Sequence, residues 1–196
     1  MTDEAPMTWR ATQKANRRAE LMAAAARLFA ERGFGAVSTA DLGDAVGMSG
    51  PALYRHFASK EALLCALLID ASGRLLDGGR ALTATIGDPQ RAITALIDFH
   101  LDFATTDADV IRVQDRELGN LPADVNQQVR RLQREYVQEW DRPFAVLRPD
   151  LAPGQRQTRL LATFGLLNST PHSAAPSAGD TRGILAGMAE RALLGD

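Results

Sequence analysis

Apolar residues recur at intervals of three and four along most of this chain, and that period limits the fold more than any other feature of the sequence. The first instance is a stripe made of Leu21, Ala24, Ala25, Leu28 and Phe29. We find no strand-length alternation bounded by hairpin turns and no internal repeat. The chain is therefore predicted to be all-α, with about nine helices.

Capping residues and helix breakers divide this pattern into segments. The first helix is expected from Arg17 to Gly33, because glycine commonly terminates helices. Ser38 and Asp41 have the spacing of a capping box at the start of a second, short helix. After a third short segment, further helices are expected over residues 59–76, 88–103, 109–118, 122–147, 155–167 and 180–194, with a loosened helix end and a loop over 78–89 and a loop at 169–179.

The overall composition is that of an ordinary globular protein. The chain has 196 residues, 45% hydrophobic and 23% charged, which gives room for one to two domains. Its apolar runs are too short or too interrupted to span a bilayer, and no secretory signal follows Met1. The single cysteine, Cys65, lies in an apolar run and is read as a small buried hydrophobe rather than a redox sensor. These features predict a cytoplasmic protein.

Charged residues are unevenly distributed along the chain, although the net charge is only −2. Up to Leu64 there are eight Lys/Arg against seven Asp/Glu, so the remainder of the 22 basic and 24 acidic residues is net acidic. The mildly basic N-terminal part favours an anionic partner there, although a charge run is more often a solvated face.

Two short helical segments, Ser38 to Val46 and Ser49 to Phe57, are separated only by Gly47 and Met48. This is the spacing of a helix-turn-helix, in which a small residue lets the second helix cross the first sharply. Leu42, Val46 and Leu53 are expected inside. The outer face of the second segment is left with Ser49, Gly50, Ala52, Tyr54, Arg55 and His56. Small residues at its start would let the helix approach base edges in the major groove.

Four sequence blocks lie in and around this motif: Leu28-Phe29-Ala30-Glu31-Arg32-Gly33-Phe34, Ser38-Thr39-Ala40-Asp41-Leu42, Gly47-Met48-Ser49 and Leu53-Tyr54-Arg55-His56-Phe57-Ala58-Ser59-Lys60-Glu61-Ala62-Leu63. With them the chain resembles the TetR family of repressors from about Arg17 to Leu68, and the Tyr-x-x-Phe-x-x-Lys spacing is the most specific part. The resemblance implies three DNA-binding helices, a connecting fourth helix, and a variable ligand-binding and dimerisation domain.

The resemblance also implies which residues contact DNA. Phosphate contacts are expected from Ser38, Tyr54, His56 and Lys60, and a groove-facing edge from Ser49, Gly50, Pro51 and Ala52; Thr39 and Arg55 complete the expected DNA-binding set. The chain departs from the family at Ala40, where a polar or basic residue is common, and at Gly43, where alanine is usual. The first departure could remove a DNA contact, and the second could loosen the packing of its helix.

Several of these residues have a plainer interpretation. Phe57 is expected in the core, Tyr54 could be there in part, and His56 could be solvated. Lys60 could be a solvated first-turn residue, but a cation at that position opposes the helix dipole, which favours a phosphate partner.

Beyond Ile69 the resemblance fades, and the expectations rest on the pattern alone. Ligand cavities are mostly apolar with a few polar groups, so the candidates to line one are Phe99, His100, Phe103, Gln114, Tyr136, Trp140, Phe144, Phe164 and Asn168. Most of them could be ordinary core. The acidic Asp107, Asp109 and Asp115 argue mildly against a strongly anionic ligand. Neither His100 nor His172 has the companions of a metal site, and no cofactor is expected.

Small and apolar residues alternate over 162–170. This segment and the final helix, 184–194, are expected to form a four-helix dimer seam, as in the family. The expected domains are an arm at 1–15, a helix-turn-helix DNA-binding domain at 16–60, and a ligand-binding and dimerisation domain at 61–196. The predicted function is that of a homodimeric repressor, released from a near-palindromic operator by a largely apolar small molecule.

Two other classes of protein compete with this prediction. An enzyme could use Asp98, Asp102, Asp115 and Glu117 as carboxylates, but these lie on amphipathic helices with charged neighbours, and no nucleophile elbow or phosphate-binding glycine loop accompanies them. A ligand-independent architectural DNA-binding protein would need a more basic surface. We therefore expect a regulator and not an enzyme, while the sequence leaves repressor and activator undecided.

Overall fold

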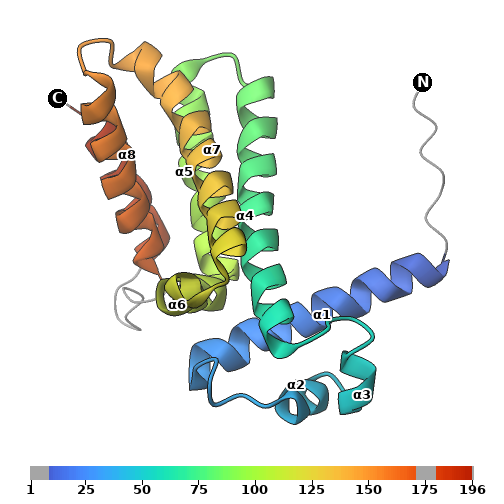
Figure 1. Ribbon diagram of the computed structural model, residues 1–196. Helices are drawn as coiled ribbons and strands as arrows, with labels where there is room; N and C mark the ends of the chain where they lie inside the picture. Colours follow the sequence, from blue (N-terminus) through green and yellow to red (C-terminus); the bar gives the residue numbers. More distant parts are fainter. Residues whose placement is uncertain (1–8, 171–179, 196) are drawn as a thin grey trace. The chain divides into compact units, whose positions relative to one another are not determined.

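A computed structural model describes residues 9–170 and 180–195 of the chain. The described elements are all helical, which confirms the predicted all-α class. In chain order they are α1 (Trp9–Arg32), α2 (Thr39–Ala45), α3 (Gly50–Leu53), α4 (Lys60–Thr85), α5 (Pro89–Thr106), α6 (Ala108–Glu117), a short 3₁₀ helix η1 (Leu118–Asn120), α7 (Ala123–Leu147), α8 (Pro153–Asn168) and α10 (Thr181–Leu194) (Figure 1).

The chain divides into two compact units, Met1–Leu67 and Leu68–Asp196, and α4 begins in the first and ends in the second. The predicted domain boundary at residue 60 coincides with the first turn of α4, somewhat before this division. In the second unit, α5, α7, α8 and α10 pack around a core that includes Ile93, Trp140, Phe144 and Leu160. None of the described helices is both long enough and apolar enough to cross a membrane.

Local caps explain why several helices start where the sequence predicts. The Ser38 hydroxyl accepts from the Asp41 N–H at 3.1 Å, while the Ser38 N–H donates to the Asp41 carboxylate at 2.8 Å. Ser59 caps α4 by accepting from the Ala62 N–H at 3.0 Å. The carboxylate of Asp88 caps α5 in the same way. Each bond satisfies a backbone N–H that the first turn of a helix leaves unpaired.

Helix α1 corrects the prediction of an arm over residues 1–15. It begins at Trp9, so residues 9–15 are helical, whereas residues 1–8 lie outside the described part of the chain. The segment Arg10 to Asn16 contains several good helix formers and neither glycine nor proline. Its apolar period begins only at Leu21, which is why periodicity placed the start too late.

Helix α4 corrects the predicted loop at 78–89, because it continues through Gly78 and Gly79 to Thr85. A Cβ added to Gly78 would lie 2.1 Å from the ring of Phe99, and one added to Gly79 would lie 2.7 Å from the ring of Tyr136. The two glycines therefore allow α4 to pack closely against α5 and α7. The predicted loop at 169–179 lies mostly outside the described residues.

Candidate nucleic-acid interface and internal cavity

The turn between α2 and α3 is built on Gly47. Its φ is +63°, a conformation that costs glycine little and other residues more, and the following Met48 N–H donates to the Gly43 carbonyl at 2.8 Å. Leu42 and Leu53 are fully buried beneath the turn, as predicted. The predicted helix-turn-helix is therefore present, with a glycine where the backbone requires one.

Helix α3 is shorter than predicted and presents a different set of side chains. It ends at Leu53, and the chain continues to Phe57 in turns such as His56 N–H to Leu53 C=O. Ala52, expected on the groove-facing edge, is only 8% exposed, and this expectation is corrected because its methyl group packs inward. Tyr54, at 52%, and Arg55 are exposed, whereas Phe57 is buried as predicted.

The serines that begin α2 and α3 differ in what their hydroxyls do. Ser38 uses its hydroxyl within the capping box, where it also donates to the Asp41 carboxylate, and these bonds hold the pKa of Asp41 below its usual range. Ser49 is exposed and makes no cap hydrogen bond with its side chain. The Ser49 hydroxyl is therefore available to an outside partner. Thr39, in the first turn of α2, is half-buried.

Lys60 is tied to the backbone of its own unit. Its Nζ donates to the carbonyl oxygens of Phe34 and Val37, each at 2.7 Å, and lies 4.4 Å from the centre of the Phe34 ring. These carbonyls explain a cation at the N-terminus of α4 without any phosphate. The ammonium has three protons, so one is left for a further partner.

His56 lies among cationic side chains. Burial and then the charges of Lys14, Arg55 and Arg18 lower the pKa of its imidazole. Its Nδ1 is buried and has no hydrogen-bond partner among the described residues, whereas its carbonyl accepts from Arg18 at 3.1 Å. The lowered pKa favours the neutral imidazole in this positive environment.

The second unit contains a cavity of about 220 Å³. Of the predicted lining residues, the structure brings six together around it: His100, Phe103, Gln114, Tyr136, Phe164 and Asn168. The others do not line it. Phe99 packs against Gly78, while Trp140 and Phe144 are fully buried in the core.

Seven further lining residues were missed by the sequence reading: Ser72, Leu75, Val110, Ile111, Gln133, Val137 and Leu161. They come from α4, α6, α7 and α8 and are mostly aliphatic. Periodicity does mark them as inward-facing positions of amphipathic helices. It does not separate a residue that faces a cavity from one that faces packed core, so no signal in a single sequence could have selected them.

Three polar side chains form a hydrogen-bonded chain in the cavity wall. The Nε2 of His100 lies 3.0 Å from Oδ1 of Asn168, and its Nδ1 lies 3.4 Å from the Tyr136 hydroxyl. Burial lowers the pKa of His100 to about 4 and raises the pKa of Tyr136 above its usual range. At neutral pH the imidazole therefore carries one proton and no charge.

Residues 21–67 match the family model described as bacterial regulatory proteins of the tetR family. A TetR-family transcriptional regulator from Bordetella parapertussis shares the fold with a TM-score of 0.81 and 26% identity, covering 91% of this chain and 94% of that chain. Over residues 21–67 the chain therefore matches the TetR family. The resemblance predicted from about Arg17 to Leu68 is thereby confirmed.

Curated relatives match a smaller share of this chain than the solved structure does. The transcriptional activator FasR of Mycolicibacterium smegmatis is 33% identical over 50% of this chain and 44% of its own length. The transcriptional repressor KstR2 of Rhodococcus jostii is 32% identical over 56% of this chain and 54% of its own length. The chain thus spans about half the length of these relatives. AibR, solved with isovaleryl coenzyme A and operator DNA, shares the fold at a TM-score of 0.76 and 19% identity, over 91% of this chain and 98% of AibR.

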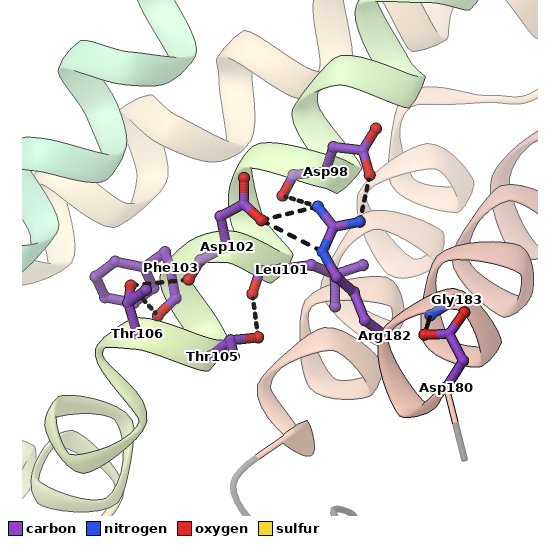
Figure 2. Close-up of polar contacts among 9 residues, drawn as sticks. All are labelled: Asp98, Leu101, Asp102, Phe103, Thr105, Thr106, Asp180, Arg182 and Gly183. Carbon is purple, nitrogen blue, oxygen red and sulfur yellow. Dashed lines mark hydrogen bonds and ion pairs between the residues drawn. The ribbon is translucent and has the colours of Figure 1, made fainter.

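The carboxylates considered for an enzyme have other partners in this chain. Arg182 of α10 donates to Asp98 at 3.0 Å and to Asp102 at 2.8 Å, and so ties α10 to α5 (Figure 2). Glu117 accepts from the Asn120 amide at 3.2 Å. Among the described residues, no group of three or more His, Cys, Asp or Glu could hold a metal ion. His172 lies outside the described residues.

The acidic residues near α6 are also paired. Asp107 binds Arg74 at 2.8 Å, and Asp109 binds Arg112 at 2.8 Å. Their charges are therefore partly neutralised, which weakens the prediction that they repel an anionic ligand.

Cys65 is half-buried rather than fully buried.

Proposed function

We propose that this TetR-family chain is a homodimeric transcriptional repressor that leaves its operator when a small molecule enters the second unit. The observation that carries the proposal is the helix-turn-helix, whose residues match the family model and whose exposed side chains include Ser49, Tyr54 and Arg55. A relative named as a repressor is 32% identical over 56% of this chain. A protein with this role would act in the cytoplasm, where its operator lies.

The proposed DNA contacts follow from which hydrogen-bonding groups each residue can still offer to DNA. Ser49 and Arg55 face outward and would read base edges together with the Gly50–Pro51 backbone, while Tyr54 and Lys60 would bind phosphates. Ser38, Thr39 and His56 would complete the surface. Ala52 is left out because it is buried.

The proposed dimer seam lies on α8 and α10. Leu161 is 53% exposed, Ile184 54% and Met188 43%, and the two helices pack against each other. Large exposed apolar side chains on adjoining helices favour burial against a second copy. A twofold axis there would present two recognition units to a near-palindromic duplex.

The cavity of the second unit is the proposed effector site. It is mostly apolar with a few polar groups, which is typical of small-molecule sites. Helix α4 lines the cavity at Ser72 and Leu75, and its first residue, Lys60, belongs to the DNA-binding unit. A ligand that prefers one arrangement of α4 would shift the population of DNA-competent dimers by its difference in affinity.

The experiment that tests this function is footprinting followed by transcription in vitro. The chain is expected to protect a symmetric pair of half-sites and to reduce transcription from the adjoining promoter. Protection without symmetry would overturn the dimer proposal. Increased transcription would instead assign an activator role, as the name of FasR indicates for that relative.

A further inference from the structure

The residues that line the cavity are all uncharged at neutral pH within the described part of the chain. The lining contains no Lys, Arg, Asp or Glu, and its only histidine is neutral because it is buried. An anionic group inside would lose its hydration without gaining a counter-charge, which is costly. The cavity is therefore built for an uncharged group.

The hydrogen bonds of His100 determine which atoms the cavity offers to a ligand. Oδ1 of Asn168 can only accept, so Nε2 of His100 is the protonated nitrogen and donates to it. Nδ1 is then an acceptor, and the Tyr136 hydroxyl donates to it. With Oδ1 engaged, the Asn168 amide is left with its two N–H donors, which have no partner among the described residues. A ligand at Asn168 therefore meets a donor.

Cavity volume limits the size of the buried group. A cavity of about 150 Å³ holds benzene. The cavity here, of about 220 Å³, suits a molecule of one or two rings. Aromatic side chains, Phe103 and Phe164, and aliphatic ones, Val110 and Ile111, supply the apolar remainder of the wall.

We propose that the cavity binds a compact, uncharged molecule of one or two rings whose ketone or similar acceptor takes a hydrogen bond from the Asn168 amide. This inference rests on the proposed function and names the class of its effector. His100 is a positioning residue, because it sets the orientation of the Asn168 amide. Specificity follows because a ligand without an acceptor covers the part-buried Asn168 amide without pairing its donors.

An acyl thioester is the main alternative occupant. A surface groove that contains Arg130 and Arg134 adjoins the cavity at Gln133, Val137 and Leu161, and it could take an anionic carrier while an acyl chain enters the cavity. The thioester carbonyl is an acceptor like that of a ketone, but the lining of the cavity itself contains no Lys or Arg to pair with an anionic carrier, which favours the uncharged ketone. The thioester becomes an outcome of the test.

The test measures binding of four probes by calorimetry: 1-tetralone, its hydrocarbon isostere tetralin, tetralin-1-carboxylate and isovaleryl coenzyme A. Tetralone is expected to bind about tenfold more tightly than tetralin, the value of one buried hydrogen bond. The carboxylate and the thioester are expected not to bind. Tighter binding of either anion, equal binding of tetralone and tetralin, or no saturable binding of tetralone would overturn the proposal.

Variants separate a direct contact from a structural role. Asn168→Leu and Asn168→Asp are expected to lose the preference for tetralone, whereas Asn120→Leu, which changes an amide outside the cavity, is expected to keep it. His100→Phe should lose the preference while still binding tetralin, and His100→Gln, whose amide can donate to Asn168, should restore it. Retention of the preference in both Asn168 variants would contradict the assignment.

Binding is measured without DNA, so its outcome is independent of repression. Operator binding by the chain alone and its release by tetralone are then measured by fluorescence anisotropy. Selective probe binding without any operator binding would support the ligand class and refute the proposed function. Operator binding with no saturable probe binding would support the proposed function and refute the ligand class.

Discussion

The guanidinium of Arg74 on α4 makes two hydrogen bonds with the carboxylate of Asp107, at 2.8 and 3.3 Å, and so joins α4 to the start of α6. The same guanidinium lies 5.7 Å from the centre of the ring of Phe103, which lines the cavity. The hydrogen bonds that Arg74 donates to Asp107 raise the pKa of Arg74 above its ordinary value. This pair therefore connects α4, which lines the cavity at Ser72 and Leu75, to the start of α6.

Breaking that connection is expected to weaken the effect of a ligand on DNA binding. Asp107→Asn should leave tetralone affinity unchanged and reduce its effect on operator affinity by up to about fivefold, the limit for a partly exposed ion pair. Fluorescence anisotropy with labelled operator measures the ratio of the operator affinities without and with tetralone. Asp109→Asn is the control, because it breaks the Asp109–Arg112 pair within α6. Equal ratios in both variants would refute the connection.

Gly79→Ala tests the close packing of α4. Alanine normally stabilises a helix interior by about 0.5–1 kcal/mol relative to glycine. Here the new methyl would lie 2.7 Å from the Tyr136 ring, so we expect a net loss of about 1–3 kcal/mol in the free energy of unfolding. Gly73→Ala, on the same helix with nothing within 4 Å, should stabilise instead. Urea denaturation measures both, and stabilisation of Gly79→Ala would show that α4 is not closely packed there.

The buried imidazole of His100 predicts a loss of stability in acid. Its folded pKa of about 4 lies below the ordinary 6.5, so between these values the unfolded chain binds a proton that the folded chain does not. The contribution is complete above pH 6.5 and falls by about 3 kcal/mol as the pH drops to 4. His100→Gln should lose less stability between pH 7 and pH 4.5 in denaturant titrations. Parallel losses in both proteins would contradict a neutral buried His100.

Lys60→Met separates a structural role from a phosphate contact. Removing the ammonium leaves the carbonyls of Phe34 and Val37 without their donor, at a cost of about 1–3 kcal/mol in stability. If the third ammonium proton of Lys60 binds a phosphate, the slope of log operator affinity against log salt concentration should also become shallower by about one. Tyr54→Phe is expected to weaken binding to all sequences without changing the slope. A Lys60→Met variant with unchanged slope would leave Lys60 a structural residue only.

Local sequence was sufficient for the parts of this protein that depend on neighbours along the chain. The helix-turn-helix follows from Ser38 and Asp41, which bond to each other, and from Gly47, whose backbone conformation favours glycine. The helices after α4 also start within a few residues of the predicted positions, and the carboxylates of Asp88 and Asp180 cap α5 and α10 within one turn. Lateral packing was therefore not needed to place them.

Tertiary structure alone decided which side chains meet. Gly78 and Gly79 suggest a helix end in the sequence, yet they mark close approach to Phe99 and Tyr136, residues distant along the chain. Lys60 finds carbonyl partners 23 and 26 residues away, and Ala52 is buried although the sequence placed it on the outer face. Periodicity assigns a residue to the inner face of its helix, whereas a cavity arises where several such faces fail to fill the space between them. That difference depends on the summed shapes of α4 to α8, which no single segment encodes.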